Sequence, residues 1–97
     1  MSSSLVVRYR TKPECADENA RLISDVFAEL AQSKPEGISY HAYRLADGVS
    51  FVHTVTLTTT LNPLTSSAAF AAFQAGIAER CEDGPTPAQA TEVGSYG

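Results

Sequence analysis

Residues 38–57, ISYHAYRLADGVSFVHTVTL, contain two runs rich in β-branched and aromatic residues. The runs extend from Ile38 to Ala46 and from Val49 to Leu57, and the dipeptide Asp47-Gly48 separates them. An Asp-Gly pair accepts the positive φ angles of a tight two-residue turn. We therefore predict a β-hairpin whose register is centred on this dipeptide.

The predicted register assigns each side chain of the hairpin to one face of the sheet, because alternate residues of a strand point to opposite sides. One face would carry the facing pairs Ala46 and Val49, Arg44 and Phe51, Ala42 and His53, Tyr40 and Val55, and Ile38 and Leu57. The other face would carry His41, Tyr43, Leu45, Val52, Thr54 and Thr56. The two histidines then lie on opposite faces and cannot share a metal ion within one subunit.

The segments on either side of the hairpin predict two further strands and two helices. Alternation predicts a strand over Leu5 to Thr11, and apolar residues at steps of three and four predict a helix from Glu14 to about Ser33. The same spacing predicts a second helix near Ser66 to Glu82, ended by Gly84-Pro85. A last strand is expected from about Ala88 to Tyr96.

This order of elements, β-α-β-β-α-β, is that of an α+β ferredoxin-like fold. Right-handed crossovers in both halves give an antiparallel four-stranded sheet in the order 4-1-3-2, with two helices on one face. At 97 residues the chain is long enough for one core and short for two, so we expect a single domain over residues 1–97.

Composition narrows the classes of partner. A formal charge of −4 disfavours nucleic acid and anionic membranes, and no segment has the length or apolarity of a signal peptide core or a membrane span. We therefore expect a cytoplasmic protein. Cys15 and Cys81 match no metal spacing, and in that compartment two reduced thiols are the simplest interpretation.

Two helices cover only one face of such a sheet, which leaves the second face to be explained. That face would mix apolar with polar residues, namely Val6, Arg8, Arg10, His41, Tyr43, Leu45 and Val52. Packing two such faces together predicts a homodimer through the sheet. The alternative is an ordinary half-solvated antiparallel sheet.

Several segments, in this order, resemble the antibiotic biosynthesis monooxygenase family. They are Arg8-Tyr9, Tyr40-His41-Ala42-Tyr43-Arg44, Asp47-Gly48, Phe51-Val52-His53, Phe70-Ala-Ala-Phe73 and Val93-Gly94-Ser95-Tyr96. The resemblance implies a dimeric α/β barrel with a ligand cavity between helices and sheet. Some members of that family oxidise polycyclic phenols or quinols with O₂ and neither metal nor flavin. Other members degrade haem and depend on a tryptophan, and the absence of Trp from this chain counts against that branch.

The register places His53 in the middle of a central strand, beneath the helices, near Tyr9 and Tyr40. A neutral imidazole beside phenolic hydroxyls could take a proton from a phenol or quinol and so form an anion that O₂ oxidises. His53 and Tyr9 are thus the candidate catalytic residues. The candidate substrate-binding residues are Tyr40, Phe51, Phe70 and Phe73. The plainer alternative is a buried histidine satisfied by one tyrosine hydroxyl.

Two functions from different classes are considered, the first of which is implied mainly by the family resemblance. The first is a monooxygenase that needs no cofactor and no metal, or a related enzyme, acting on a small aromatic phenol or quinol. The second is a non-catalytic dimeric module for ligand binding or assembly, in which the same side chains fill the core. A pocket beside His53 of about 300 Å³ or more, the usual size of small-molecule sites, would favour the first.

Overall fold

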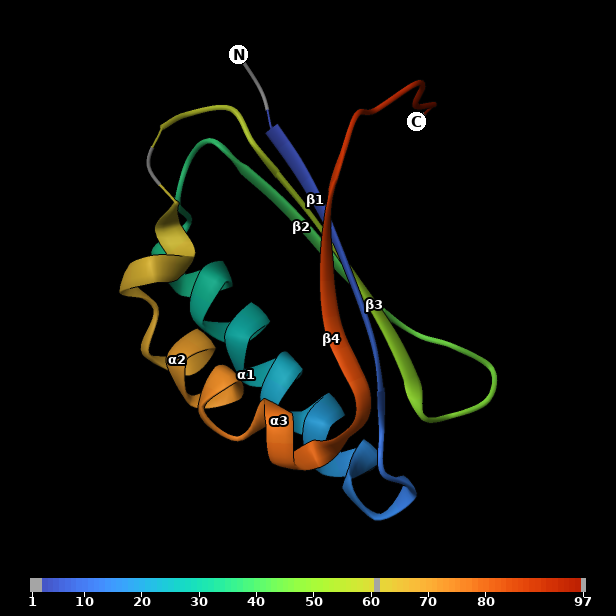
Figure 1. Ribbon diagram of the computed structural model, residues 1–97. Coiled ribbons are helices and arrows are strands. Elements are labelled where there is room, and N and C mark those ends of the chain that lie inside the picture. Colours follow the sequence, from blue (N-terminus) through green and yellow to red (C-terminus); the bar gives the residue numbers. More distant parts are fainter. Residues whose placement is uncertain (1–2, 61, 97) are drawn as a thin grey trace.

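The computed structural model describes residues 3–60 and 62–96, and it contains one four-stranded antiparallel sheet in the order β2-β3-β1-β4. The strands are β1 (Ser3–Thr11), β2 (Ile38–Arg44), β3 (Ser50–Leu57) and β4 (Cys81–Ala90), and the helices are α1 (Ala16–Ser33), α2 (Ala68–Ala75) and α3 (Ile77–Arg80). The helices cover one face of the sheet (Figure 1). The predicted α+β ferredoxin-like fold and strand order are confirmed.

The hairpin register is as predicted, because Ala42 pairs with His53 and Tyr40 with Val55. Its loop is longer than predicted. β2 ends at Arg44, and the Leu45 N–H still donates to the Ser50 carbonyl at 2.8 Å. The loop beyond this hydrogen bond is residues 46–49, not Asp47-Gly48 alone. The predicted facing of Ala46 with Val49 is therefore wrong. Both loops are centred on the same dipeptide, which is why the register survives the difference.

The Asp47 side chain stabilises this longer loop. Its carboxylate accepts the backbone N–H groups of Val49 and Ser50 at 2.9 and 2.8 Å, and the Ser50 hydroxyl at 2.6 Å. Hydrogen bonds from the Ser50 hydroxyl and from these two amides lower the pKa of Asp47. Because the Asp47 carboxylate satisfies backbone N–H groups of its own loop, a four-residue connection is as favourable here as a tight two-residue turn.

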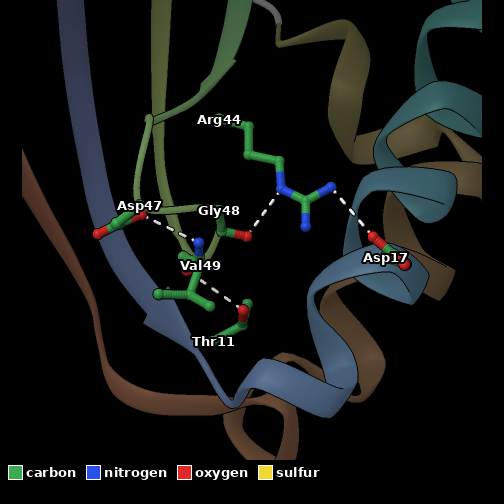
Figure 2. Close-up of polar contacts among 6 residues, drawn as sticks. All are labelled: Thr11, Asp17, Arg44, Asp47, Gly48 and Val49. Carbon is green, nitrogen blue, oxygen red and sulfur yellow. Dashed lines mark hydrogen bonds and ion pairs between the residues drawn. The ribbon is translucent and has the colours of Figure 1, made fainter.

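Arg44 connects the hairpin to α1 (Figure 2). Its Nε donates to the Gly48 carbonyl at 2.8 Å, and its Nη1 lies 3.1 Å from Oδ1 of Asp17 in the first turn of α1. Beside it, the backbone N–H of the fully buried Thr11 donates to the Val49 carbonyl at 2.8 Å. The hairpin end of β3 is thus attached both to β1 and to α1.

The second helical segment and β4 differ from the sequence prediction. The predicted helix from Ser66 to Glu82 is broken at Gly76 into α2 and α3, and the chain is already strand at Cys81. The last strand, predicted from about Ala88 to Tyr96, was therefore placed too late at both ends, since β4 begins at Cys81 and ends at Ala90. Edge position explains the error: β4 pairs only with β1, so its prolines are tolerated within the strand.

Gly84 lies at an irregularity of the β1–β4 pairing, where the register shifts. Its φ of +95° is unfavourable for other residues, and a Cβ there would lie 2.9 Å from the Arg8 carbonyl oxygen. Gly84 thus does not end a helix, as the sequence suggested, but allows close contact between two strands.

The apolar stripe predicted for α1 faces the sheet, with Ala16 and Val26 buried. The α-helix begins two residues later than predicted, because Pro13–Cys15 form a 3₁₀ turn. Glu29 of α1 accepts the backbone N–H groups of Ala68 and Ala69 at 3.2 and 2.8 Å. This carboxylate satisfies the otherwise unpaired amides at the start of α2 and ties the two helices together.

The sheet face away from the helices is partly exposed. Tyr43 retains 55% and Leu45 39% of its accessible surface. Arg8, Arg10 and His41 are also exposed, whereas Val6 and Val52 are half-buried. No helix within the described residues has the length and apolarity needed to cross a membrane.

Candidate functional site

His53 lies on the helix-covered face of β3, with one tyrosine hydroxyl at each ring nitrogen. The Tyr9 hydroxyl lies 2.7 Å from Nε2, and the Tyr40 hydroxyl lies 2.7 Å from Nδ1. Tyr9 comes from β1 and Tyr40 from β2, the two strands that pair with β3. The sequence register brought these three residues together, although it did not predict that both nitrogens would be occupied.

Burial sets the protonation state of this group. His53 retains only 4% of its accessible surface, and burial lowers its pKa to about 4. Burial raises the pKa of Tyr40 to about 12 and also raises the pKa of Tyr9. At neutral pH the site therefore holds a neutral imidazole between two neutral phenols.

Two residues that sequence reasoning did not select extend the hydrogen-bonded chain. Asn19 of α1, fully buried, donates from Nδ2 to the Tyr9 hydroxyl at 2.9 Å. Arg80 of α3 donates from Nε to Asn19 Oδ1 at 3.1 Å and from Nη2 to the Phe73 carbonyl at 2.6 Å. Among the described residues no carboxylate forms an ion pair with Arg80.

The sequence held a signal for both residues. Asn19 lies three positions after Ala16 and four before Ile23, on the apolar stripe of its helix. Arg80 likewise lies three positions after Ile77. A polar residue at a helical position otherwise occupied by apolar ones indicates a buried, hydrogen-bonded side chain.

A pocket of about 440 Å³ lies beside His53, between the sheet and the α2 region. Its walls are mostly apolar, and the predicted site residues among them are Tyr9, Tyr40, His53, Phe70 and Phe73. The other lining residues are Ser3, Leu5, Val7, Val55, Leu57, Asn62, Leu64, Thr65, Gln74, Ile77, Pro85 and Pro87. The volume exceeds the threshold of about 300 Å³ that separates the two functional hypotheses.

Phe51 does not line this pocket, contrary to the prediction. It pairs with Tyr9 in the sheet, and the two rings stack with centroids 5.5 Å apart and planes 10° apart. Only 2% of its surface is accessible. Phe51 is therefore a core residue that packs against the Tyr9 ring.

The second histidine and the two cysteines do not line this pocket. His41 is exposed on the opposite face, where Ser39 Oγ lies 3.4 Å from Nε2. Cys15 and Cys81 are free thiols, and burial raises the pKa of Cys81, which disfavours a reactive thiolate. Across residues 3–60 and 62–96, no three His, Cys, Asp or Glu side chains form a metal-binding group.

Comparison with known sequences gives no match to a protein-family profile and no match among curated proteins. Comparison with solved structures is informative. The chain matches Rv0793 from Mycobacterium tuberculosis with a TM-score of 0.79 and 15% identity, each chain being covered to 100%. It matches a candidate antibiotic biosynthesis monooxygenase from Nitrosomonas europaea with a TM-score of 0.77 and 12% identity, over 99% of this chain and 94% of that one.

SnoaB, a cofactor-independent oxygenase from Streptomyces nogalater, matches with a TM-score of 0.69 and 13% identity, over 97% of this chain and 95% of that one. Several of the structural neighbours are thus antibiotic biosynthesis monooxygenase-like proteins, as the sequence resemblance implied. At these identities the likeness establishes a common fold.

Proposed function

We propose that this protein is a cofactor-independent monooxygenase for small aromatic phenols or quinols, with its active site in the pocket beside His53. The observation that carries the proposal is an apolar pocket of about 440 Å³ that contains a neutral imidazole held between two phenolic hydroxyls. The fold shared with the oxygenase SnoaB supports the choice of reaction.

In this proposal His53 and Tyr9 remove the substrate proton together. The substrate hydroxyl donates its proton to the Tyr9 oxygen, while the proton of Tyr9 moves to Nε2 of His53. Burial disfavours the resulting imidazolium, but the negative charge formed on the substrate beside it opposes that effect. Tyr40, Phe70 and Phe73 bind the substrate.

Anthrone, which ionises through its enol form, illustrates the balance of the oxidation. The anion transfers one electron to O₂, and the carbon radical and superoxide combine to a hydroperoxide after protonation. Loss of water then gives anthraquinone, so that one oxygen atom enters the product as a carbonyl. The other oxygen leaves as water with the two hydrogens of the former methylene carbon.

Oxygen uptake with anthrone and a panel of hydroquinones tests the proposal, after subtraction of the spontaneous rate. We expect turnover by the wild type, a loss of at least about 100-fold in His53→Ala, and an unchanged rate in His41→Ala. Circular dichroism confirms that each variant is folded. Equal rates in His53→Ala and the wild type, or no turnover with any member of the panel, would refute the proposal.

Ligand binding without catalysis is the second candidate, and one observation favours it. Both nitrogens of His53 already contact tyrosine hydroxyls, so neither is free to contact a substrate directly. Under this alternative aromatic ligands raise the melting temperature of the protein while no oxygen is consumed.

We also propose a cytoplasmic homodimer formed through the exposed sheet face. Tyr43 and Leu45 favour a partner on this face, because they expose apolar surface beside Arg8 and Arg10. Tyrosine and arginine are both enriched at protein interfaces. Light scattering should give twice the chain mass at micromolar concentration, and Tyr43→Lys should shift the mass toward that of a monomer. A monomer mass for the wild type would exclude the dimer.

A further inference from the structure

Arg80 is the fixed end of the hydrogen-bonded chain beneath the helices. It retains 6% of its accessible surface, its guanidinium carbon lies 5.3 Å from the centroid of the Phe73 ring, and Nη2 donates to the Phe73 carbonyl. A guanidinium has donors only and does not lose its proton in proteins. Whatever faces its Nε must therefore be an acceptor.

This requirement fixes the amide of Asn19. Because Nε of Arg80 donates to it, the atom on that side must be Oδ1, so Nδ2 faces Tyr9. The amide nitrogen donates in turn, which makes the Tyr9 hydroxyl oxygen an acceptor. The single proton of Tyr9 then remains for its other neighbour, Nε2 of His53.

Burial decides between the two neutral forms of His53. If Nε2 carried the proton, it would donate to Tyr9, and the proton of Tyr9 would lack an acceptor at a site with 5% exposure. If Nδ1 carries the proton, it donates to Tyr40, and the unused proton belongs to the more exposed of the two tyrosines. An unsatisfied buried donor is costly, so the second arrangement is favoured.

The hydroxyl proton of Tyr40 is therefore available to the pocket. The described lining residues include no Lys, Arg, Asp or Glu, so the walls offer no counterion to a charged ligand. The uncharged polar residues Ser3, Asn62, Thr65 and Gln74 also line the pocket, but Tyr40 is the donor whose proton the His53 chain leaves unused. A mostly apolar lining with such a donor matches an uncharged aromatic ligand that carries a carbonyl or phenolic oxygen.

We infer that Arg80 and Asn19 are positioning residues that hold His53 in the Nδ1–H form, so that Tyr40 donates its hydroxyl proton to the oxygen of an uncharged aromatic ligand. This inference deepens the proposed function, since it rests on the same pocket and names the group that recognises the substrate oxygen. The direction of the chain is itself a property of the protein without ligand.

The first experiment is ¹H–¹⁵N NMR of the histidine rings in the ligand-free protein. We expect a protonated-type ¹⁵N shift at Nδ1 of His53 and an unprotonated-type shift at Nε2. Asn19→Asp should invert this pattern, because a carboxylate still accepts from Arg80 but cannot donate, so Tyr9 turns its proton to residue 19. Nε2 must then supply the proton between His53 and Tyr9.

Gln32→Glu makes the same amide-to-carboxylate change on an exposed position of α1 and should leave the pattern unaltered. An Nε2–H ring in the wild type, or no inversion in folded Asn19→Asp, would overturn the inference. If Asn19→Asp does not fold, the wild-type spectrum alone decides the direction of the chain.

The second experiment compares 9-fluorenone with fluorene, two ligands of similar shape that differ in one carbonyl. The wild type should bind the ketone about five-fold more tightly by calorimetry, and Tyr40→Phe should remove this preference. Asn19→Asp should weaken it, because the Tyr40 proton then turns to Nδ1.

No preference for the ketone in the wild type would overturn the assignment of Tyr40. Neither measurement requires turnover, because the ketone is not a substrate for oxidation. Failure of the oxygen-uptake assay with success here would therefore reject the proposed reaction and leave the positioning role intact.

Discussion

His53 and His41 lie on adjacent strands and face opposite sides of the same sheet. His53 is buried, and tyrosine hydroxyls lie 2.7 Å from both of its ring nitrogens. His41 is exposed, and its nearest hydrogen-bonding neighbour is Ser39, at 3.4 Å on the same strand. The comparison shows that the presence of a histidine does not by itself make a candidate functional site in this protein. The helices that cover one face convert a histidine and two tyrosines into a connected, neutral group.

The largest expected difference between the faces is in stability. Tyr9→Phe removes a hydroxyl that contacts both Asn19 and His53, and each orphaned group costs roughly 1–3 kcal/mol, so we expect a loss of about 4 kcal/mol. Tyr43→Phe, on the exposed face, should change the free energy of unfolding by less than about 0.5 kcal/mol. Urea denaturation measures both, and similar losses would show that the faces do not differ in this respect.

A second difference is expected in pH dependence. An unfolded histidine takes up a proton near pH 6.5, whereas folded His53 does so only near pH 4. Between these values the unfolded state binds more protons, so the His53 contribution is fully present above pH 6.5. It is lost as the pH falls to 4, which lowers the free energy of unfolding by up to about 3 kcal/mol.

Urea denaturation between pH 7 and pH 4 measures how steeply the free energy of unfolding falls as the pH is lowered. His53→Gln should make this fall smaller by the contribution of His53, whereas His41→Asn should leave it unchanged. A slope that responds equally to both substitutions would contradict the contrast drawn between the two histidines.

The smallest expected effect concerns the contact between α1 and α2, which cover the side of the sheet that carries His53. Glu29→Gln replaces the carboxylate that caps the start of α2 with a neutral amide. We expect the free energy of unfolding to fall by about 1 kcal/mol. Asp25→Asn on the same helix removes only the exposed pair with Arg21 and should cost less than about 0.5 kcal/mol. Thermal unfolding of the two variants distinguishes these values. An equal change in melting temperature would contradict the capping role of Glu29.

The fold was predictable as far as local patterns determine it. The alternation of residues 38–57 and the central Asp47-Gly48 gave the hairpin register, and the right-handed crossover gave the strand order. The loop length was not predictable in the same way. It depends on the Asp47 carboxylate binding two backbone amides, and a two-residue turn would have produced the same facing pairs between β2 and β3.

The end of the chain was harder because β4 lacks the pattern of a strand. Its residues, CEDGPTPAQA, contain two prolines and a glycine and are mostly exposed. They form a strand because β1 supplies an edge, which is a tertiary influence that no local propensity records. The early start of β4 at Cys81 follows from the same cause.

The site was predicted in part. The register brought Tyr9, Tyr40 and His53 to one place, and Phe70 and Phe73 line the same pocket. It could not show that Phe51 lies behind Tyr9, since both face the same side of the sheet. Asn19 and Arg80 interrupt apolar stripes, but their partners lie 10 and 61 residues away in sequence, and only the folded chain brings them together.

The loop between β2 and β3 also constrains how insertions and deletions can occur in this chain. Removing one residue from each side of its centre would leave Ala42 opposite His53. Removing one residue and closing the gap by sliding β3 would exchange the two sides of the strand, placing Val52 beneath the helices and His53 toward the exposed face. Homologous chains that keep the pocket should therefore differ in this loop by even numbers of residues.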